Sequence, residues 1–250
     1  MEQFKLPTEI VELPSKGTIY SKDNPLSSGK VEMKYMTAKE EDILTNQNYI
    51  KNGTVLDKLL TSLIVSEINY NDLITGDKNA LLIAARVLGY GKDYSFKYTD
   101  DNGNTVEANV DLSELEDKPL ALSELNQEGV NEFNFKLPHS ENEITYKLLT
   151  HSDEKSIDKE ITGLKKVTGG AAPESTTRLK YLITSIGGDR EKKTIREFVD
   201  KYMLARDSRA LREEYRRVAP DVELTYFPED ATEGIPVPIS LNFFWPDASI

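Results

Sequence analysis

The sequence repeats parts of itself at a spacing close to half its length, and this repeat constrains the fold more than any other feature. The tetrapeptide FKLP stands at residues 4–7 and again at 135–138. Four further matches follow in the same order: residues 31–37 with 144–150, 56–62 with 179–185, 77–81 with 207–211, and 93–98 with 221–226. A common order of strands and capped helices also produces such matches by accident. Because all five keep one order, we predict a tandem duplication.

A duplicated chain of 250 residues predicts two similar lobes, residues 1–128 and 129–250. Each lobe is long enough to bury a core of its own. We therefore expect an α+β protein in which each lobe has strands, about three helices and a closing β-hairpin. The expected shape has a pseudo-twofold axis, which is common in adaptor and assembly proteins but also allows an enzyme site between the lobes.

Apolar periodicity and capping residues predict the elements of the first half. Residues 31–36 alternate like a strand, and Thr37 with Glu40 forms a capping box that opens a helix. A second helix follows from the stripe at 56–64, and a third, at 80–88, is expected to be capped by Asp77 and to end at Gly89. Residues 94–98 and 105–110 flank a turn rich in Asn, Asp and Gly, which predicts a hairpin.

The second half predicts a similar series of elements. Strands are expected at 131–137 and 144–149, and helices at 152–166, 176–187, 194–204 and 207–218. Thr194 with Glu197 reads as the capping box of the third of these helices. A closing β pair is expected at 222–227 and 235–244, where Pro236 and Pro238 restrict the last strand to an edge or a bulge.

Composition excludes several classes of function. The formal charge is −12 and the pI is near 4.8, so a protein that wraps nucleic acid is not expected. With no Cys, the chain lacks disulfides, thiol nucleophiles and thiolate zinc sites. No secretory signal opens the chain, and the richest apolar stretch, 81–88, contains Arg86. We expect a protein made in a cytosol, without membrane partners.

No motif selects a catalytic, cofactor or metal site. The two histidines, His139 and His151, lack a second ligand at metal spacing, so both are interpreted as surface or capping residues. Residues 100–104 resemble a calcium loop but carry Gly at the wrong position, and 163–170 lacks the order of a phosphate loop. We therefore predict a non-enzymatic protein. An enzyme that uses paired carboxylates between the lobes stays open as an alternative.

Charge is unevenly distributed along the chain. Residues 178–217 hold twelve basic and seven acidic residues, a balance of +5, which leaves −17 for the rest. In the last predicted helix Arg209, Arg212 and Arg216 share one face. This face is either a solvated surface with local pairs such as Arg209 with Glu213, or a docking face for an acidic partner. DNA is a weaker candidate because the remaining surface is negative.

Three adjacent aromatic residues stand near the C-terminus: Phe243, Phe244 and the single Trp, Trp245. They cannot all face inward on a strand, whose side chains alternate between faces. They either pack back onto the second lobe or anchor a neighbouring subunit, since aromatic residues are enriched in interface hot spots.

Several short motifs are spread over most of the chain: LPSKG at 13–17 with Tyr20, the stretches 31–44 and 52–60, GDKN at 76–79, ARVLGYG at 85–91 and FFWPD at 243–247. Together these motifs resemble the baseplate hub family of T-even-like contractile-tailed bacteriophages. Some similar sequences carry Cys-Pro-x-Cys knuckles in their hairpins. The matching stretches here, 99–102 and 227–230, have no Cys, so no zinc site is implied.

The resemblance implies a structural component of the phage tail baseplate, in the hub region. Its expected partners are other tail and baseplate proteins, with self-association as an alternative. Its expected location is the virion, after synthesis in the host cytoplasm. The resemblance also leaves open an assembly factor that is absent from the mature virion. The expected interaction residues are Arg209, Arg212, Arg216, Phe243, Phe244 and Trp245.

Overall fold

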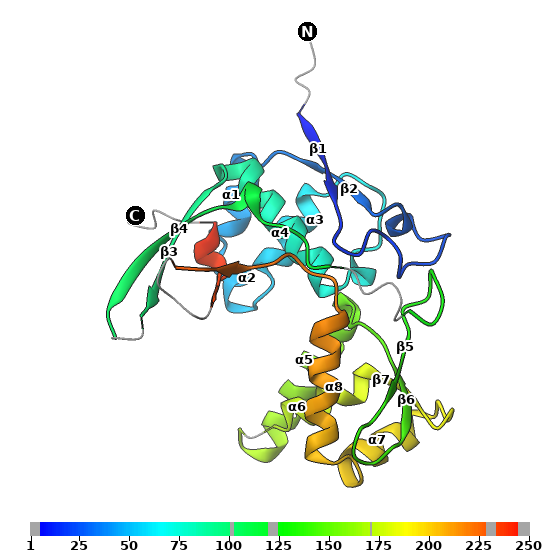
Figure 1. Ribbon diagram of the computed structural model, residues 1–250. Helices are drawn as coiled ribbons and strands as arrows, with labels where there is room; N and C mark the ends of the chain where they lie inside the picture. The colour runs from blue at the N-terminus through cyan, green and yellow to red at the C-terminus, as the bar shows by residue number, and fades with distance from the viewer. Residues whose placement is uncertain (1–5, 101–102, 120–124, 171, 229–233, 245–250) are drawn as a thin grey trace.

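The computed structural model describes residues 6–100, 103–119, 125–170, 172–228 and 234–244. Figure 1 shows two bodies, an upper one built from the first half of the chain and a lower one built from most of the second half. We name them the N-terminal lobe and the C-terminal lobe. Their helices and small antiparallel sheets confirm the predicted α+β class.

The N-terminal lobe consists of two β-hairpins around a group of helices. Its helices and strands are β1 (Thr8–Glu12), β2 (Lys30–Lys34), α1 (Ala38–Leu44), α2 (Gln47–Lys51), α3 (Val55–Leu63), α4 (Thr75–Tyr90), β3 (Asp93–Thr99) and β4 (Thr105–Asp111), with 3-10 turns η1 (Pro25–Ser28), η2 (Tyr70–Asp72) and η3 (Leu112–Glu114). Strands β1 and β2 pair antiparallel, as do β3 and β4. The predicted hairpin around residues 99–105 is thereby confirmed, although residues 101–102 lie outside the described part of the chain.

The C-terminal lobe packs four helices against a three-stranded antiparallel sheet. Its elements are β5 (Phe133–Lys136), β6 (Glu143–Tyr146), α5 (His151–Thr168), α6 (Glu174–Leu182), β7 (Ile183–Ile186), α7 (Lys192–Lys201) and α8 (Ala205–Val218). The prediction of one helix over 176–187 is wrong at its end. Residues 183–186, ITSI, are largely β-branched and pair with β6, where Ile144 lies opposite Ile186.

One of the two predicted capping boxes is present in the structure. The predicted box of Thr37 and Glu40 is present at α1, and Thr150 with Asp153 forms a second at α5. The predicted box at Thr194 is wrong, because α7 already begins at Lys192 and Thr194 lies inside it.

Helix α4 also differs from its prediction at both ends. It begins at Thr75, before Asp77, and passes through Gly89 to end at Tyr90, just before Gly91, whose φ is +86°. Asp77 does not cap the helix. Its carboxylate accepts hydrogen bonds from Ser15 N (3.0 Å), Ser15 Oγ (2.8 Å) and Tyr20 Oη (2.6 Å), all from the loop after β1.

Several contacts recur in both halves. Lys34 Nζ lies 2.9 Å from Glu40 Oε1, and Lys147 Nζ lies 2.8 Å from Asp153 Oδ1 at the matching position. Asp207 is the third residue of α8, as Asp77 is of α4. Asp207 accepts hydrogen bonds from the backbone N–H groups of His139 (2.8 Å) and Ser140 (3.0 Å), in the turn after β5. The predicted duplication stays an inference that these contacts support.

The segment after α8 leaves the C-terminal lobe and crosses to the N-terminal lobe (Figure 1, orange to red). We name residues 220–228 and 234–244 the return segment. It contains β8 (Thr225–Tyr226), β9 (Ile235–Pro236) and the 3-10 turn η5 (Leu241–Phe243). Glu223 N donates to Glu116 O (2.7 Å), and Lys118 N donates to Asp221 O (2.8 Å). The described strands of the closing pair are therefore shorter than predicted, and they rest on the first half of the chain.

One cluster of buried apolar side chains runs through both lobes and the return segment. It includes Leu59 and Leu81 of the N-terminal lobe, Tyr146 and Leu211 of the C-terminal lobe, and Phe243 of the return segment. The division of the chain at residues 128 and 129 stays a prediction, and the return segment belongs to the second half of the chain but packs on the first lobe.

Candidate interaction site

The two lobes meet where α5 begins. His151 N donates to Leu73 O (2.8 Å), and Ile74 forms an isolated antiparallel bridge with Thr150. The His151 ring lies edge-on to Tyr70, with ring centroids 4.7 Å apart. The start of α5 is thus held against the loop that leads into α4.

Asp57 organises the polar side chains of this seam. Its carboxylate accepts hydrogen bonds from Lys78 Nζ (2.6 Å) and Tyr70 Oη (2.9 Å), and His151 Nε2 lies 3.5 Å away. Burial alone would raise the pKa of Asp57, but Lys78 and Tyr70 outweigh it and lower the pKa. Burial lowers the pKa of His151, so its ring is neutral at pH 7. The ion pair of Asp57 with Lys78 therefore lies within the N-terminal lobe, and the His151 ring of the C-terminal lobe packs beside it.

The two histidines differ in their surroundings. His139 is exposed on a turn, as predicted. The prediction that His151 is a surface or capping residue is wrong, because Thr150 caps α5 and the His151 side chain is only 8% exposed. The side chains that contact His151, those of Tyr70 and Asp57, come from a distant part of the chain, which the local sequence does not show.

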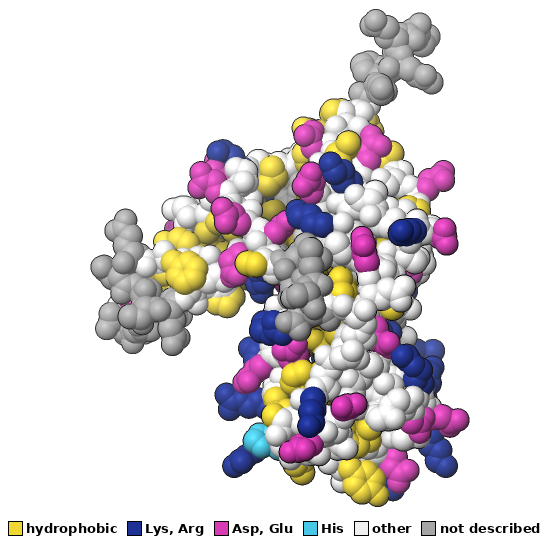
Figure 2. Space-filling view, turned by 45° about the vertical axis from the view of Figure 1, so that its right-hand side comes forward, with side chains coloured by type: hydrophobic (Ala, Val, Ile, Leu, Met, Phe, Trp, Pro, Cys, Tyr) yellow, Lys and Arg dark blue, Asp and Glu magenta, His cyan; other side chains and the backbone are white. Residues whose placement is uncertain are grey.

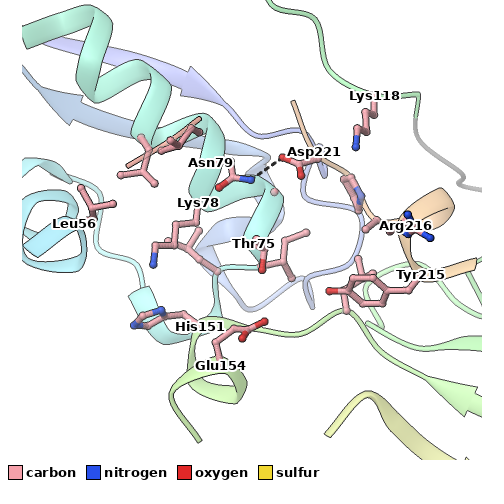
Figure 3. A pocket seen from close by; sticks show the side chains of 18 of the residues that line it. Leu56, Thr75, Lys78, Asn79, Lys118, His151, Glu154, Tyr215, Arg216 and Asp221 are labelled. Carbon is pink, nitrogen blue, oxygen red and sulfur yellow. Dashed lines mark hydrogen bonds between the residues drawn. The ribbon is translucent and has the colours of Figure 1, made fainter. Parts of the chain in front are cut away.

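A cavity of about 510 Å³ opens beside the seam. Figure 3 shows that the start of α4, the start of α5, the end of α8 and the return segment each contribute to its wall. Its polar lining includes Lys78, Asn79, Lys118, His151, Glu154, Arg178, Tyr215, Arg216 and Asp221. The cavity therefore combines residues from both lobes.

Its two carboxylates are each held by a partner of their own. Arg178 donates two hydrogen bonds to Glu154, at 2.6 and 2.8 Å. Asp221 Oδ1 accepts from Asn79 Nδ2 (3.0 Å) and from Val222 N (2.9 Å). Glu154 is thus held in an ion pair and Asp221 by hydrogen bonds, and both side chains form part of the cavity wall.

The three arginines of the predicted face of α8 have two different kinds of surroundings. Arg209 Nε lies 2.8 Å from Glu213 Oε1, the local pair expected for a solvated face, and it lines none of the described cavities. Arg212 and Arg216 both line a second cavity of about 290 Å³ between α6 and α8. Neither makes an ion pair with a described carboxylate. Arg212 Nη1 donates to Ser208 Oγ (2.9 Å), and Arg216 Nε lies 3.4 Å from Arg212 O.

Arg178 and Tyr215 complete this second cavity and were not selected from the sequence. Both also line the cavity at the seam, so the two cavities are neighbours. The signal that could have found Arg178 is its spacing with Leu179 and Leu182, which puts all three on one side of α6. Nothing in the local sequence shows that α6 faces α8.

Charge on the surface follows the sequence asymmetry. In Figure 2 acidic side chains are spread over the upper lobe, and many Lys and Arg side chains lie along the flanks of the lower lobe. Helices α6 and α8 both overlap the basic stretch 178–217.

Phe243 and Phe244 do not form a surface anchor. Phe243 and Phe244 are both 0% exposed. Phe243 packs edge-on to Tyr94, with centroids 4.8 Å apart, and Phe244 packs against Phe243. The prediction of an anchor for a neighbouring subunit is wrong for these two residues. They also pack onto the first lobe rather than the predicted second one, through Tyr94 of β3 and Arg86 of α4. Trp245 lies outside the described residues.

The described residues contain neither a metal-binding cluster nor a membrane-spanning helix. No group of three or more His, Cys, Asp or Glu side chains there could hold a metal ion. None of the helices in the described part of the chain combines the length and the apolar character needed to cross a membrane.

Comparison with known proteins identifies one family. The model of the family described as T4 bacteriophage base plate protein matches residues 7–166, which is more than half of the chain. The match covers the helices and strands of the N-terminal lobe and continues through β5 and β6 of the C-terminal lobe into α5. Neither the curated proteins nor the solved structures contain a match to the chain.

Proposed function

Because the chain belongs to the T4 bacteriophage base plate protein family, we propose that it is a non-enzymatic structural component of a phage tail baseplate, in the hub region. The family match carries this proposal. In this role the protein binds other baseplate and tail proteins and stays in the virion after synthesis in the host cytoplasm.

The position of the charged residues supports a binding role. Arg212 and Arg216 keep their guanidinium groups free of described carboxylates, although the chain as a whole carries 43 acidic residues. Arginine is the favoured cation at protein interfaces because its planar group binds carboxylates in a fixed geometry. We therefore assign the contact with a neighbouring protein to the C-terminal lobe.

A phage with a nonsense codon in this gene tests the proposal. Infection of a non-suppressing host is expected to give particles without complete tails, and a plasmid copy of the gene is expected to restore them. Electron microscopy of the lysate provides the measurement. Normal infectious particles from the uncomplemented mutant would contradict a role in the baseplate.

A further inference from the structure

The groove between α6 and α8 has an apolar floor and a basic rim. Leu149, Leu179 and Leu182 form the floor, and Arg178, Arg212 and Arg216 form the rim. The groove stays open because α6 packs chiefly on α5 and α7 rather than on α8. We name this feature the α6–α8 groove.

We propose that the α6–α8 groove binds an acidic segment of a neighbouring baseplate protein, with one apolar side chain in the cavity and flanking carboxylates on Arg212 and Arg216. The inference rests on the proposed function and adds the chemistry of the partner. The size of the cavity, about 290 Å³, suits side chains better than a whole cofactor.

Charge complementarity selects an acidic partner. Arg178 is already neutralised by Glu154, whereas Arg212 and Arg216 make no ion pair with a described carboxylate. Two guanidinium groups one helical turn apart can each bind a carboxylate, and such charge-assisted hydrogen bonds are the strong ones. A long polyanion such as nucleic acid would also meet the acidic remainder of the chain, so a short acidic segment fits better.

The groove is also preorganised. Tyr215 Oη accepts a hydrogen bond from Leu149 N (3.3 Å), which ties α8 to the segment before α5. The bidentate pair of Arg178 with Glu154 ties α6 to α5. Because both walls are fixed before binding, little ordering is required when a partner segment docks.

A labelled peptide tests the groove in the full-length protein. The probe is a fluorescein-labelled Gly-Glu-Glu-Leu-Glu-Glu-Gly, with binding followed by fluorescence anisotropy. We expect saturable binding that weakens with added salt, and a loss of about tenfold when Leu in the probe is replaced by Ser. Equal binding of both probes would overturn the role of the apolar floor.

Two charge-reversal variants distinguish an effect of the groove on binding from an effect of overall charge. Arg212→Glu with Arg216→Glu is expected to weaken binding by about tenfold or more. The matched control, Arg206→Glu with Arg209→Glu, makes the same change of charge on exposed positions of α8 outside the groove, and its effect is expected to stay within about twofold. Equal losses in the two variants would overturn the proposal.

A third variant closes the groove without a change of charge. Ser175 is exposed and lines the cavity, so Ser175→Trp should block it and abolish binding of the probe. Circular dichroism confirms that each variant is folded. Normal peptide binding by Ser175→Trp, or binding of a single-stranded oligonucleotide in preference to the peptide, would overturn the proposal. A concentration-dependent dimer that Arg212→Glu with Arg216→Glu abolishes would replace the partner segment by a second copy of the chain.

Incorporation into particles distinguishes failure of this inference from failure of the proposed function. The groove variant Arg212→Glu with Arg216→Glu is expected to be missing from virions, while the control variant is incorporated. Normal incorporation of both variants would overturn the docking role of the groove and leave the baseplate role intact. A different outcome would contradict the baseplate role itself: wild type and both variants present in the lysate, but wild type absent from virions.

Discussion

Three buried carboxylates, each on a single residue, hold loops and helix starts together by accepting hydrogen bonds. Glu40 is 0% exposed and accepts hydrogen bonds from Lys34, Ser62 and Thr37. Asp77 and Asp207, also 0% exposed, each hold the loop of a β-hairpin to the first turn of a helix. Local patterns identified the capping role of Glu40. They did not identify Asp77 and Asp207 as acceptors, because the donors lie 57 and 62 residues from Asp77 and 67 and 68 residues from Asp207.

The first prediction concerns Glu40→Gln. Burial alone would raise the pKa of Glu40, but its hydrogen bonds with Thr37, Lys34 and Ser62 outweigh it and lower the pKa to about 2. Because the folded-state pKa lies below the unfolded value, the carboxylate stabilises the fold above that unfolded value, near pH 4.5, and this stabilisation is lost as the pH falls towards 2. Glu40→Gln should lower the free energy of unfolding by roughly 2 kcal/mol at pH 7.

Urea unfolding at several pH values measures this effect. The difference between wild type and Glu40→Gln should shrink as the pH falls from neutral towards 3. A difference that stays constant across this range would show that the ionised carboxylate is not the stabilising form.

At the scale of elements, the sequence predicts more than half of the helices and strands, and the errors have physical causes. The predicted equivalence of residues 56–62 and 179–185 is the clearest example. The letters LLTS at 59–62 lie within α3, whereas the corresponding LITS at 182–185 ends α6 and forms β7. Residues 183–186 become a strand because β6 offers them an open edge, which is a tertiary effect that overrides local periodicity.

Two glycines in helices provide a matched prediction about α4 and α5. A Cβ atom at Gly76 would lie 1.8 Å from Pro220 O, where the return segment crosses α4. A Cβ atom at Gly163, in α5, would meet nothing within 4 Å. Gly76→Ala should therefore destabilise the protein by about 1–3 kcal/mol, and Gly163→Ala should stabilise it by about 0.5–1 kcal/mol.

Thermal unfolding followed by circular dichroism measures both variants. We expect the two melting temperatures to shift in opposite directions. A stabilised Gly76→Ala would contradict the close approach of Pro220 to α4.

At the scale of the whole molecule, the return segment joins the second half of the chain to the first. Arg86, which is 1% exposed, makes one of the polar contacts that hold the return segment to the N-terminal lobe. Its guanidinium donates to Phe243 O (2.9 Å), Gly91 O (2.5 Å) and Asp93 O (2.9 Å). In the sequence Arg86 only interrupts an apolar stretch, so neither its burial nor its partners could be predicted.

The third prediction concerns Arg86→Met. The substitution leaves three carbonyl groups without their donor, and we expect a loss of about 3 kcal/mol in the free energy of unfolding. Arg86→Lys should not restore stability, because one ammonium group lacks the planar fork that reaches all three acceptors. Limited proteolysis should show faster cleavage in the return segment of both variants. Cleavage at the wild-type rate would contradict the anchoring role of Arg86.

The candidate site shows the same division between what sequence can and cannot predict. The arginine face of α8 and its local pair of Arg209 with Glu213 follow from helical spacing. The apolar floor supplied by Leu149, Leu179 and Leu182 requires knowledge of how α6 and α8 lie in space. The aromatic residues Phe243 and Phe244 were candidates for an interface because their enclosure by the opposite lobe has no local signal.

The central claim is that this chain is a structural part of the phage baseplate. Quantitative mass spectrometry of purified virions, with copy number determined against the tail tube protein, tests it most directly. The account predicts a small, stoichiometric number of copies in every particle. Absence from purified virions, together with abundance in the infected-cell lysate, would contradict it and would identify the chain as an assembly factor instead.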